Sequence, residues 1–383
     1  MDSTITLRTA RILIVDDSAV MRSLLRRVIG CDNRLEVAGT ANDGASALRA
    51  IVAIRPDLVL LDVDMPGMDG LSTLKEMKAQ GMKVPVIMCS ALTQRGARVT
   101  IEALASGASD YVAKPSGQPS REAAVQTLVH NLVPKIIALT EPAISAATQT
   151  PITNPITHHV TAHHAITHPA PIAPPSQATP SVLLIGASTG GPAALDVLLP
   201  ALPAGFPIPI LIVQHMPELF TRPLAERLDS RCQLRVREAT SGEKLQCGVA
   251  YIAPGGWHLE IAATTALREP IIRLTHDAPE HFCRPSVDVL FRSAVAVYGA
   301  NILAVMLTGM GSDGLAGCRL IRAHNGTVIA QDRHTSAVWG MPGAVAQAGL
   351  AYRVLPLDAI APEIIRLTGI GQRPACEPRE SFA

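Results

Sequence analysis

One pattern of apolar segments occurs twice along this chain of 383 residues. Short runs rich in Val, Ile and Leu alternate with stretches in which apolar residues recur at helical spacing. A strand that reads as a nearly uninterrupted apolar run is typical of a parallel sheet that helices cover on both faces. The pattern therefore predicts the α/β class, with two doubly wound parallel-sheet domains.

The expected elements set the domain limits. Residues 1–140 would form the first domain, 181–370 the second, and 371–383 a flexible tail. In the first domain we expect strands at 11–15, 36–40, 58–61, 84–89 and 111–113, and helices at 18–29, 44–55, 70–79 and 95–106. In the second we expect strands at 181–185, 208–213, 249–253, 302–307, 326–330 and 352–354, and helices at 191–199, 219–229, 286–298, 314–324 and 341–348.

Residues 141–180 differ in composition from both domains. They contain eight prolines, seven threonines, five histidines and a single charge, Glu141. Such a segment buries too little apolar surface to offset its ordering entropy, so we predict a linker. Its histidines (158, 159, 163, 164 and 168) are candidate metal ligands, but no fold would preorganise them, and the linker interpretation is favoured.

Charge and cysteine content exclude several classes of protein. The 33 basic and 32 acidic residues nearly cancel, so no overall field attracts nucleic acid. Seven scattered cysteines without a C-x-x-C pair fit neither a disulfide framework nor a zinc ribbon. Neither a signal peptide nor an apolar run long enough for a membrane helix is recognisable, so we expect a cytoplasmic protein.

Polar side chains follow four of the strands expected in the first domain. Asp16 and Asp17 follow the first, Asp62 the third, Ser90 the fourth and Lys114 the fifth. Carboxyl ends of parallel strands share one edge, where clustered carboxylates need a cation such as Mg²⁺. Asp62 is then placed to attack a phosphoryl group, with Ser90 and Lys114 near the transferred oxygens. Helix capping explains any one Asp more simply, but the five residues together favour the phosphoryl site.

Residues 10–130 resemble a response-regulator receiver domain. The resemblance rests on the segments 14–17 (IVDD), 61–70 (LDVDMPGMDG), 90–91 (SA) and 111–115 (YVAKP). It implies a flavodoxin-like fold in which a histidine kinase phosphorylates Asp62. The implied Mg²⁺ ligands are Asp16, Asp17, Asp62 and the backbone carbonyl of Asp64, and the implied relay residues are Ser90, Tyr111 and Lys114.

A serine lies at the first strand-to-helix turn of the second domain. Ser188 stands in the segment 186–190 (GASTG), which fits the G-x-S-x-G pattern of an exposed nucleophile. The N–H groups of Thr189 and Gly190 are candidate oxyanion donors. A phosphate-binding or capping serine fits this segment equally well.

A histidine and an aspartate complete a candidate triad. His215 follows the neighbouring strand, where it is placed to act as general base for Ser188. Asp313 lies in the segment 309–314 (GMGSDG), at the start of a helix that favours its ionised form. We prefer Asp313 as the triad acid over Asp277, Asp288 and Asp332.

The same segment admits a second interpretation. Gly309, Gly311 and Gly314 form a G-x-G-x-x-G pattern, and Asp332 stands where a Rossmann domain binds a ribose. A dinucleotide-dependent oxidoreductase is therefore an alternative. Against it, the carboxylate of Asp313 would repel a pyrophosphate at the helix start.

Residues 181–370 resemble the catalytic domain of the chemotaxis protein-glutamate methylesterases. The matching segments are 186–191 (GASTGG), 214–216 (QHM), 253–258 (APGGWH), 284–288 (RPSVD), 307–314 (LTGMGSDG) and 339–343 (WGMPG). The resemblance implies a Rossmann-like α/β/α domain in which Ser188 attacks the methyl ester of a receptor glutamate and releases methanol. Water activated by His215 then hydrolyses the acyl-enzyme, and the Met310 N–H contributes to the oxyanion site.

The resemblance also implies partners and regulation. The substrates would be methyl-accepting chemotaxis receptors, whose glutamines are deamidated by the same route, and membrane contact would occur only through them. Mg²⁺ would serve the first domain, and the ester step would need no cofactor. Phosphorylation would open the cleft of Ser188.

Two questions stay open at this stage. A response regulator with a noncatalytic output, such as a DNA-binding or scaffold module, is a further alternative, although the second domain lacks a concentrated basic stripe. Trp257, His258 and Arg284 either line the substrate cleft or belong to turns and caps.

Overall fold

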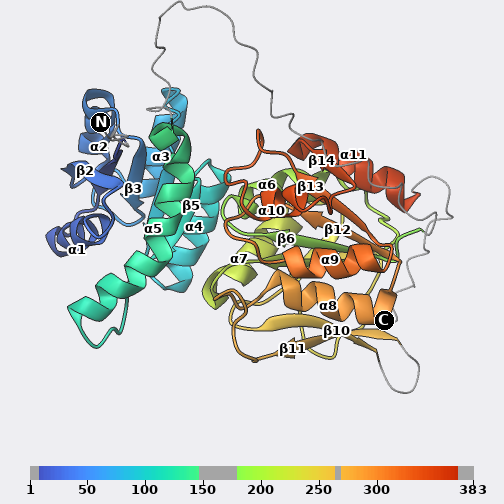
Figure 1. Ribbon diagram of the computed structural model, residues 1–383. Coiled ribbons are helices and arrows are strands. Elements are labelled where there is room, and N and C mark those ends of the chain that lie inside the picture. Colours follow the sequence, from blue (N-terminus) through green and yellow to red (C-terminus); the bar gives the residue numbers. More distant parts are fainter. Residues whose placement is uncertain (1–7, 146–178, 264–268, 370–383) are drawn as a thin grey trace, which may run out of the picture.

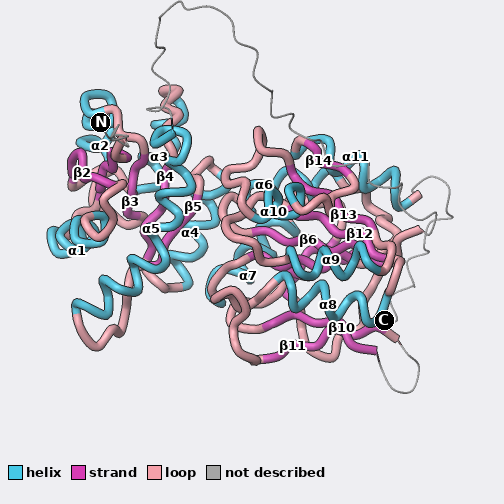
Figure 2. The backbone as a smooth tube through the Cα atoms, in the orientation of Figure 1, coloured by secondary structure: helices cyan, strands magenta, loops and turns pink. Residues whose placement is uncertain are grey.

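The computed structural model describes residues 8–145, 179–263 and 269–369. Two parallel sheets, each in its own α/β domain, lie side by side (Figure 1). The strands run through the middle of each domain, with helices on either side (Figure 2). The predicted class, with two parallel-sheet α/β domains, is confirmed. The histidines of the segment 141–180 lie outside the described residues.

The first domain has a five-stranded parallel sheet with the order β2-β1-β3-β4-β5. This is the flavodoxin-like order, with its switch point between β1 and β3. The strands are β1 (Ala10–Val15), β2 (Leu35–Ala41), β3 (Leu58–Asp62), β4 (Val86–Ser90) and β5 (Asp110–Ala113). Helices α1 (Ala19–Ile29) and α5 (Arg121–Ser145) cover one face, and α2 (Gly44–Ile54), α3 (Gly70–Ala79) and α4 (Gln94–Ala105) cover the other.

The second domain has a seven-stranded parallel sheet with the order β14-β13-β12-β6-β7-β9-β8. The strands are β6 (Val182–Ala187), β7 (Ile210–Gln214), β8 (Arg235–Glu238), β9 (Val249–Ile252), β12 (Ile302–Met306), β13 (Thr327–Gln331) and β14 (Arg353–Leu355). The chain moves outward from β6 through β7 and returns to β12 on the other side of β6. Ligands of such sheets bind at this switch point, beyond the carboxyl ends of the central strands.

Helices cover both faces of this sheet. One face carries α6 (Gly191–Leu198), the short 3-10 helix Leu199–Ala201, α7 (Glu218–Asp229) and α11 (Leu357–Thr368). The other carries α8 (Val287–Tyr298), α9 (Leu315–Ala323), α10 (Met341–Gln347) and an antiparallel hairpin of β10 (His258–Ala263) and β11 (Pro270–Thr275). In the described parts of the chain, no helix has the length and apolar character needed to cross a bilayer.

Some elements were not predicted from the sequence. These are the strands β8, β10 and β11 and the helices α5 and α11. Strand β8 reads RVRE, which carries too many charges for an apolar-run criterion. Helix α5 continues to Ser145, so five residues of the segment predicted as linker are helical.

The two domains share a packed interface. Helix α4 of the first domain packs against α6 and α7 of the second, and buried residues of both domains form one continuous apolar cluster. The ring of Tyr111 stacks on Phe220, with centroids 4.7 Å apart. Arg98 and Glu226 form an ion pair of 3.7 Å at the same contact. The first domain therefore packs against the helices that flank the switch point of the second domain's sheet.

Candidate functional sites

The carboxylates predicted at the edge of the first sheet lie together. Asp16 and Asp62 are buried, Asp17 is exposed, and one oxygen of each lies within 4.8 Å of the others. The Nζ atom of Lys114 lies 2.8 Å from Asp16 and 2.7 Å from Asp62. Ser90 is fully buried at the end of β4, the strand next to β3. Three clustered carboxylate oxygens are a donor set that fits a hard divalent cation such as Mg²⁺.

Helix capping does not account for these carboxylates. The cap of α1 is Ser18, whose Oγ accepts a hydrogen bond from the N–H of Met21, and the cap of α3 is Asp69. Asp62 instead ends β3 and points to Lys114. Burial raises the pKa of Asp62 to about 6, although the Lys114 ammonium opposes the shift. The positive charge of Lys114 thus partly neutralises the buried carboxylate of Asp62.

The turn that carries Ser188 is held in place by the neighbouring strand. The N–H of Ser188 donates to the carbonyl of Thr308, 3.0 Å away, just after β12. Gly309 approaches the serine so closely that a Cβ atom there would lie 2.9 Å from the Cβ of Ser188. Gly190, with φ of +77°, reverses the chain into α6. Ser188 remains partly exposed although the turn is tightly packed.

His215 and Asp313 form a direct pair at the same edge of the sheet. The Nε2 atom of His215 lies 2.7 Å from Oδ2 of Asp313. His215 follows β7, and its backbone N–H donates to the carbonyl of Ala187, at the end of β6. The structure therefore brings together residues that are 98 positions apart in the sequence.

The start of α8 holds the carboxylate of Asp313. It accepts hydrogen bonds from the backbone N–H groups of Val287 (2.7 Å) and Asp288 (3.0 Å) and from the hydroxyl of Ser286 (2.9 Å). A helix N-terminus favours negative charge. Although burial alone would raise it, these bonds and His215 hold the pKa of Asp313 below its usual value. Asp313 is thus an ionised, oriented partner for the imidazole.

Among the four aspartates considered from the sequence, Asp313 is the one that pairs with His215. Asp288 accepts a bond from the N–H of Gly317 and faces His281. Asp332 accepts two hydrogen bonds from Thr335. The geometry thus gives no support to Asp332 as a ribose ligand.

Sequence reasoning missed a thiol beside the imidazole. The Sγ atom of Cys283 lies 3.5 Å from Nδ1 of His215, the nitrogen that does not face Asp313. Burial disfavours the imidazolium, but the bond to Asp313 and the contact with Cys283 outweigh it and raise the pKa of His215 to about 9. In the sequence, the position of Cys283 directly before the segment 284–288 is the feature that could have identified it as a residue of the site.

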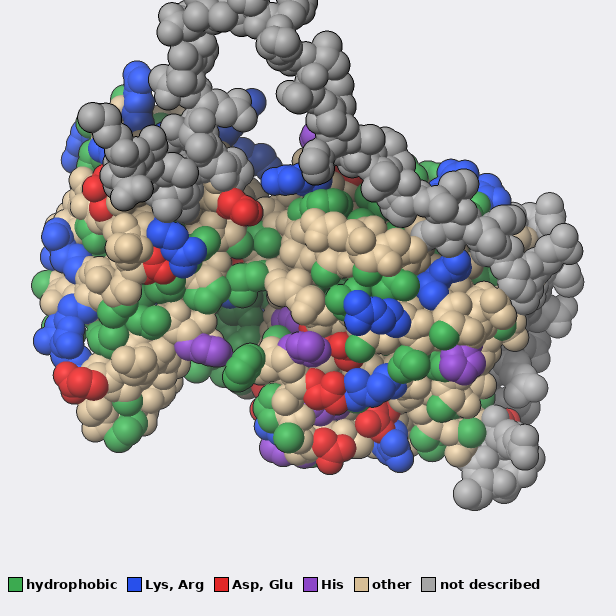
Figure 3. Space-filling model, viewed as in Figure 1, with side chains coloured by type: hydrophobic (Ala, Val, Ile, Leu, Met, Phe, Trp, Pro, Cys, Tyr) green, Lys and Arg blue, Asp and Glu red, His purple; other side chains and the backbone are tan. Residues whose placement is uncertain are grey.

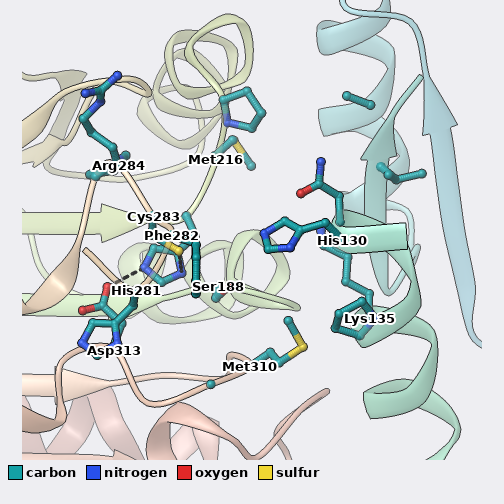
Figure 4. A pocket seen from close by; sticks show the side chains of 18 of the residues that line it. His130, Lys135, Ser188, Met216, His281, Phe282, Cys283, Arg284, Met310 and Asp313 are labelled. Carbon is teal, nitrogen blue, oxygen red and sulfur yellow. Dashed lines mark hydrogen bonds and ion pairs between the residues drawn. The ribbon is translucent and has the colours of Figure 1, made fainter. Parts of the chain in front are cut away.

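Ser188 and His215 line one cavity without a mutual hydrogen bond in the described structure. Because Asp313 engages Nε2 of His215, Nδ1, which faces Cys283, is the ring nitrogen that can accept a proton from the serine. Met310 lines the same cavity (Figure 4).

Of the three ambiguous residues, Arg284 lines the cavity that holds Ser188 and His215, whereas Trp257 and His258 are not in its lining. His258 is buried, and its Nδ1 accepts a hydrogen bond from the N–H of Ser286. Trp257 is partly exposed and packs edge-on against His276. Arg284 donates to the carbonyls of His276 and Asp277, and its guanidinium points away from Ser188 (Figure 4).

The first domain forms one wall of the cavity. The cavity measures about 520 Å³. His130 of α5 projects toward Ser188 (Figure 4), whereas Lys135, which also lines the cavity, donates to the carbonyl of Tyr111 in its own domain. Beside Ser188, the hydroxyl of Thr189 donates to Oδ2 of Asp110 over 2.7 Å, and both residues are buried. The residue after the serine is therefore bonded directly to the other domain.

These features define a class: a response-regulator receiver domain joined to a hydrolase domain that is built on a parallel sheet. Family models agree with this division: residues 12–126 match "Response regulator receiver domain", and residues 183–364 match "CheB methylesterase". A protein-glutamate methylesterase/protein-glutamine glutaminase of Nocardioides sp. (strain ATCC BAA-499 / JS614) is 47% identical, covering 96% of this chain and 98% of its own. The protein of the same name from Trichodesmium erythraeum is 43% identical, covering 94% and 99%.

A solved structure is also similar to part of this chain. The crystal structure of the Thermotoga maritima CheB methylesterase catalytic domain is 43% identical, covers 49% of this chain and 99% of its own, and has a TM-score of 0.48. Given the full-length relatives, the chain belongs to the protein-glutamate methylesterase/protein-glutamine glutaminase family.

The contacts of His215 predict how its pKa changes in two variants. In the wild type the imidazole should titrate near pH 9. Cys283→Ala should lower this pKa because a partner of the charged ring is lost, and Asp313→Asn should lower it further. NMR titration of ¹³C-labelled histidines, assigned with His215→Gln, measures both. Cys31→Ala, which changes an exposed cysteine elsewhere, is the control. An unchanged His215 pKa in Asp313→Asn would contradict the pairing.

Proposed function

We propose that this protein removes methyl esters from glutamate side chains of chemoreceptors, deamidates receptor glutamines, and is activated by phosphorylation of its receiver domain. The observation that carries the proposal is the His215–Asp313 pair at the rim of the cavity that also holds Ser188. Family membership supplies the class of substrate, and the pair supplies the means of activating a serine.

In the first step the Ser188 hydroxyl attacks the ester carbonyl. Nδ1 of His215 takes the serine proton and passes it to the departing methoxide, so that methanol leaves. Asp313 stabilises the imidazolium through Nε2. The N–H groups of Thr189, Gly190 and Met310 are the proposed donors to the oxyanion.

In the second step water releases the product. His215 takes a proton from the water, which attacks the acyl carbon, and the proton returns to Ser188 Oγ as glutamate leaves. A glutamine amide is hydrolysed by the same two steps, and ammonia leaves in place of methanol. The high pKa of His215 means that the free imidazole, the form that accepts the serine proton, increases as pH rises toward about 9.

The proposed switch lies in the receiver domain. A histidine kinase would donate the phosphoryl group to Asp62, and Mg²⁺ held by Asp16, Asp17, Asp62 and the Asp64 carbonyl would neutralise phosphate charge. Lys114 would then bond the phosphoryl oxygens instead of the two carboxylates. Ser90 and Tyr111 would relay this change to the interface, where Tyr111 stacks on Phe220.

Occlusion explains how that switch controls the serine. With the domains packed as here, α5 faces Ser188 across the cavity, so a receptor segment cannot approach it (Figure 4). Phosphorylation needs only to favour a separated arrangement of the domains. The largest possible increase in activity on phosphorylation is then set by the free-energy difference between the packed and the separated arrangement.

The enzymatic proposal is tested with methylated receptors in membranes. A small phosphodonor with Mg²⁺ should raise methanol release by the wild type by about tenfold or more, while Asp62→Ala should keep its basal rate. Ser188→Ala should lose activity by about three orders of magnitude or more in either condition. Methanol release by Ser188→Ala at the wild-type rate would refute the assigned nucleophile.

The bond between Asp110 and Thr189 predicts a constitutively active variant. Asp110→Ala removes a buried acceptor and its ion pair with Lys135, weakening the packed arrangement by about 1–3 kcal/mol. Basal demethylation without phosphodonor should rise severalfold, and Asp110→Asn, which keeps an acceptor oxygen, should rise less. Asp32→Ala, which loses an ion pair far from the interface, is the matched control.

Comparison of the Asp110 variants tests whether the hydrogen bond between Asp110 and Thr189 restrains the enzyme. Equal basal rates in Asp110→Ala, Asp32→Ala and the wild type would show that this hydrogen bond does not restrain the enzyme.

A further inference from the structure

The packed domains leave a space at the serine. The cavity between them has a volume of about 520 Å³ and is lined by groups of both domains. Ser188, His215 and Met310 belong to one side, and Tyr111, His130 and Lys135 to the other. Cavities of about 300–1,000 Å³ are the range in which proteins bind small molecules. The receiver domain therefore stands off from the nucleophile and does not fill its site.

Solvent reaches the reacting groups in this packed state. Ser188, His215 and Cys283 are each partly exposed with the receiver in place. A hollow is visible between the two domains on the face shown in Figure 3, with histidine side chains on both sides of it. The serine is thus accessible to a molecule of suitable size without any domain movement.

Side chains of both domains narrow one side of the cavity. Phe282, which is 87% exposed, meets His130 edge-on, with ring centroids 5.5 Å apart, so a bridge of side chains joins the domains beside the cavity. A helix with its side chains is about 10–12 Å across. The packed receiver consequently discriminates by size.

The lining also indicates the chemistry of a small substrate. Met216, Pro217, Phe282 and Pro134 contribute apolar surface. The charged groups Asp313, Lys135 and Arg284 are engaged by other protein groups: Asp313 by the start of α8, Lys135 by Asp110, and Arg284 by backbone carbonyls. Such a lining accommodates a neutral molecule with a small apolar group.

We propose that the unphosphorylated protein hydrolyses small neutral carboxylic esters at Ser188 within this cavity. The packed receiver domain then keeps protein substrates away from Ser188 but does not prevent ester hydrolysis there. The inference rests on the nucleophile of the proposed function. Ser188 Oγ bonds to the acyl carbon, the alkoxide leaves with the serine proton carried by His215, and water then cleaves the acyl-serine to give the carboxylic acid.

The full-length protein and p-nitrophenyl acetate test this proposal. The unphosphorylated wild type should release p-nitrophenol, and Ser188→Ala should lower kcat/KM by about three orders of magnitude. Phosphodonor with Mg²⁺ should change the wild-type value by less than about twofold, although it raises receptor demethylation by about tenfold or more.

A cavity-filling variant makes the test specific to the packed state. His130→Trp places a larger ring opposite Ser188 and should lower ester hydrolysis until phosphodonor is added, which restores it. Gln126→Trp, at an exposed position of the same helix outside the cavity, should behave as the wild type. Circular dichroism of both variants confirms that they are folded.

The outcomes separate the two proposals. Serine-dependent ester hydrolysis that appears only with phosphodonor, or that His130→Trp leaves unchanged, would overturn the inference. Receptor demethylation without hydrolysis of the small ester would refute the inference alone. Hydrolysis of the small ester by a protein that never demethylates receptors would refute the proposed function and leave the cavity activity standing.

Discussion

In the proposed mechanism, the chemistry of the second domain depends on the carboxylate of Asp313. It is buried, yet three donors at the start of α8 and the imidazole of His215 satisfy it. A buried carboxylate without such donors would be protonated and could not stabilise an imidazolium. Residues 286–288 at the start of α8 are thus connected to the imidazole of His215 through the carboxylate of Asp313.

The interface between the domains links the two sites through few groups. Asp110 and Tyr111 begin β5, the strand that ends next to Lys114, and they contact Thr189 and Phe220 in the other domain. A change at Lys114 is therefore only a few residues from a bond to the residue that follows Ser188. In the proposed mechanism, this short route lets one phosphoryl group control access to Ser188 in the other domain.

Much of this arrangement could be predicted from the sequence because apolar runs and strand-end residues obey simple rules. The switch point between β6 and β12 explains why Ser188 and Asp313 line the same cavity. Cys283 and Asp110 were missed because their roles depend on tertiary packing: one faces His215 and the other reaches Thr189 across the interface. Helix α5 was missed although Ser120 marks its start by accepting a hydrogen bond from the N–H of Ala123, and it supplies His130 and Lys135 to the cavity.

Labelling with a fluorophosphonate, a serine-directed reagent, followed by peptide mass mapping tests the central claim most directly. The account predicts one adduct, on Ser188, that is strongly reduced in His215→Ala and in Asp313→Ala. An adduct that forms on Ser188 equally well in both variants, or that forms on another side chain, would contradict it.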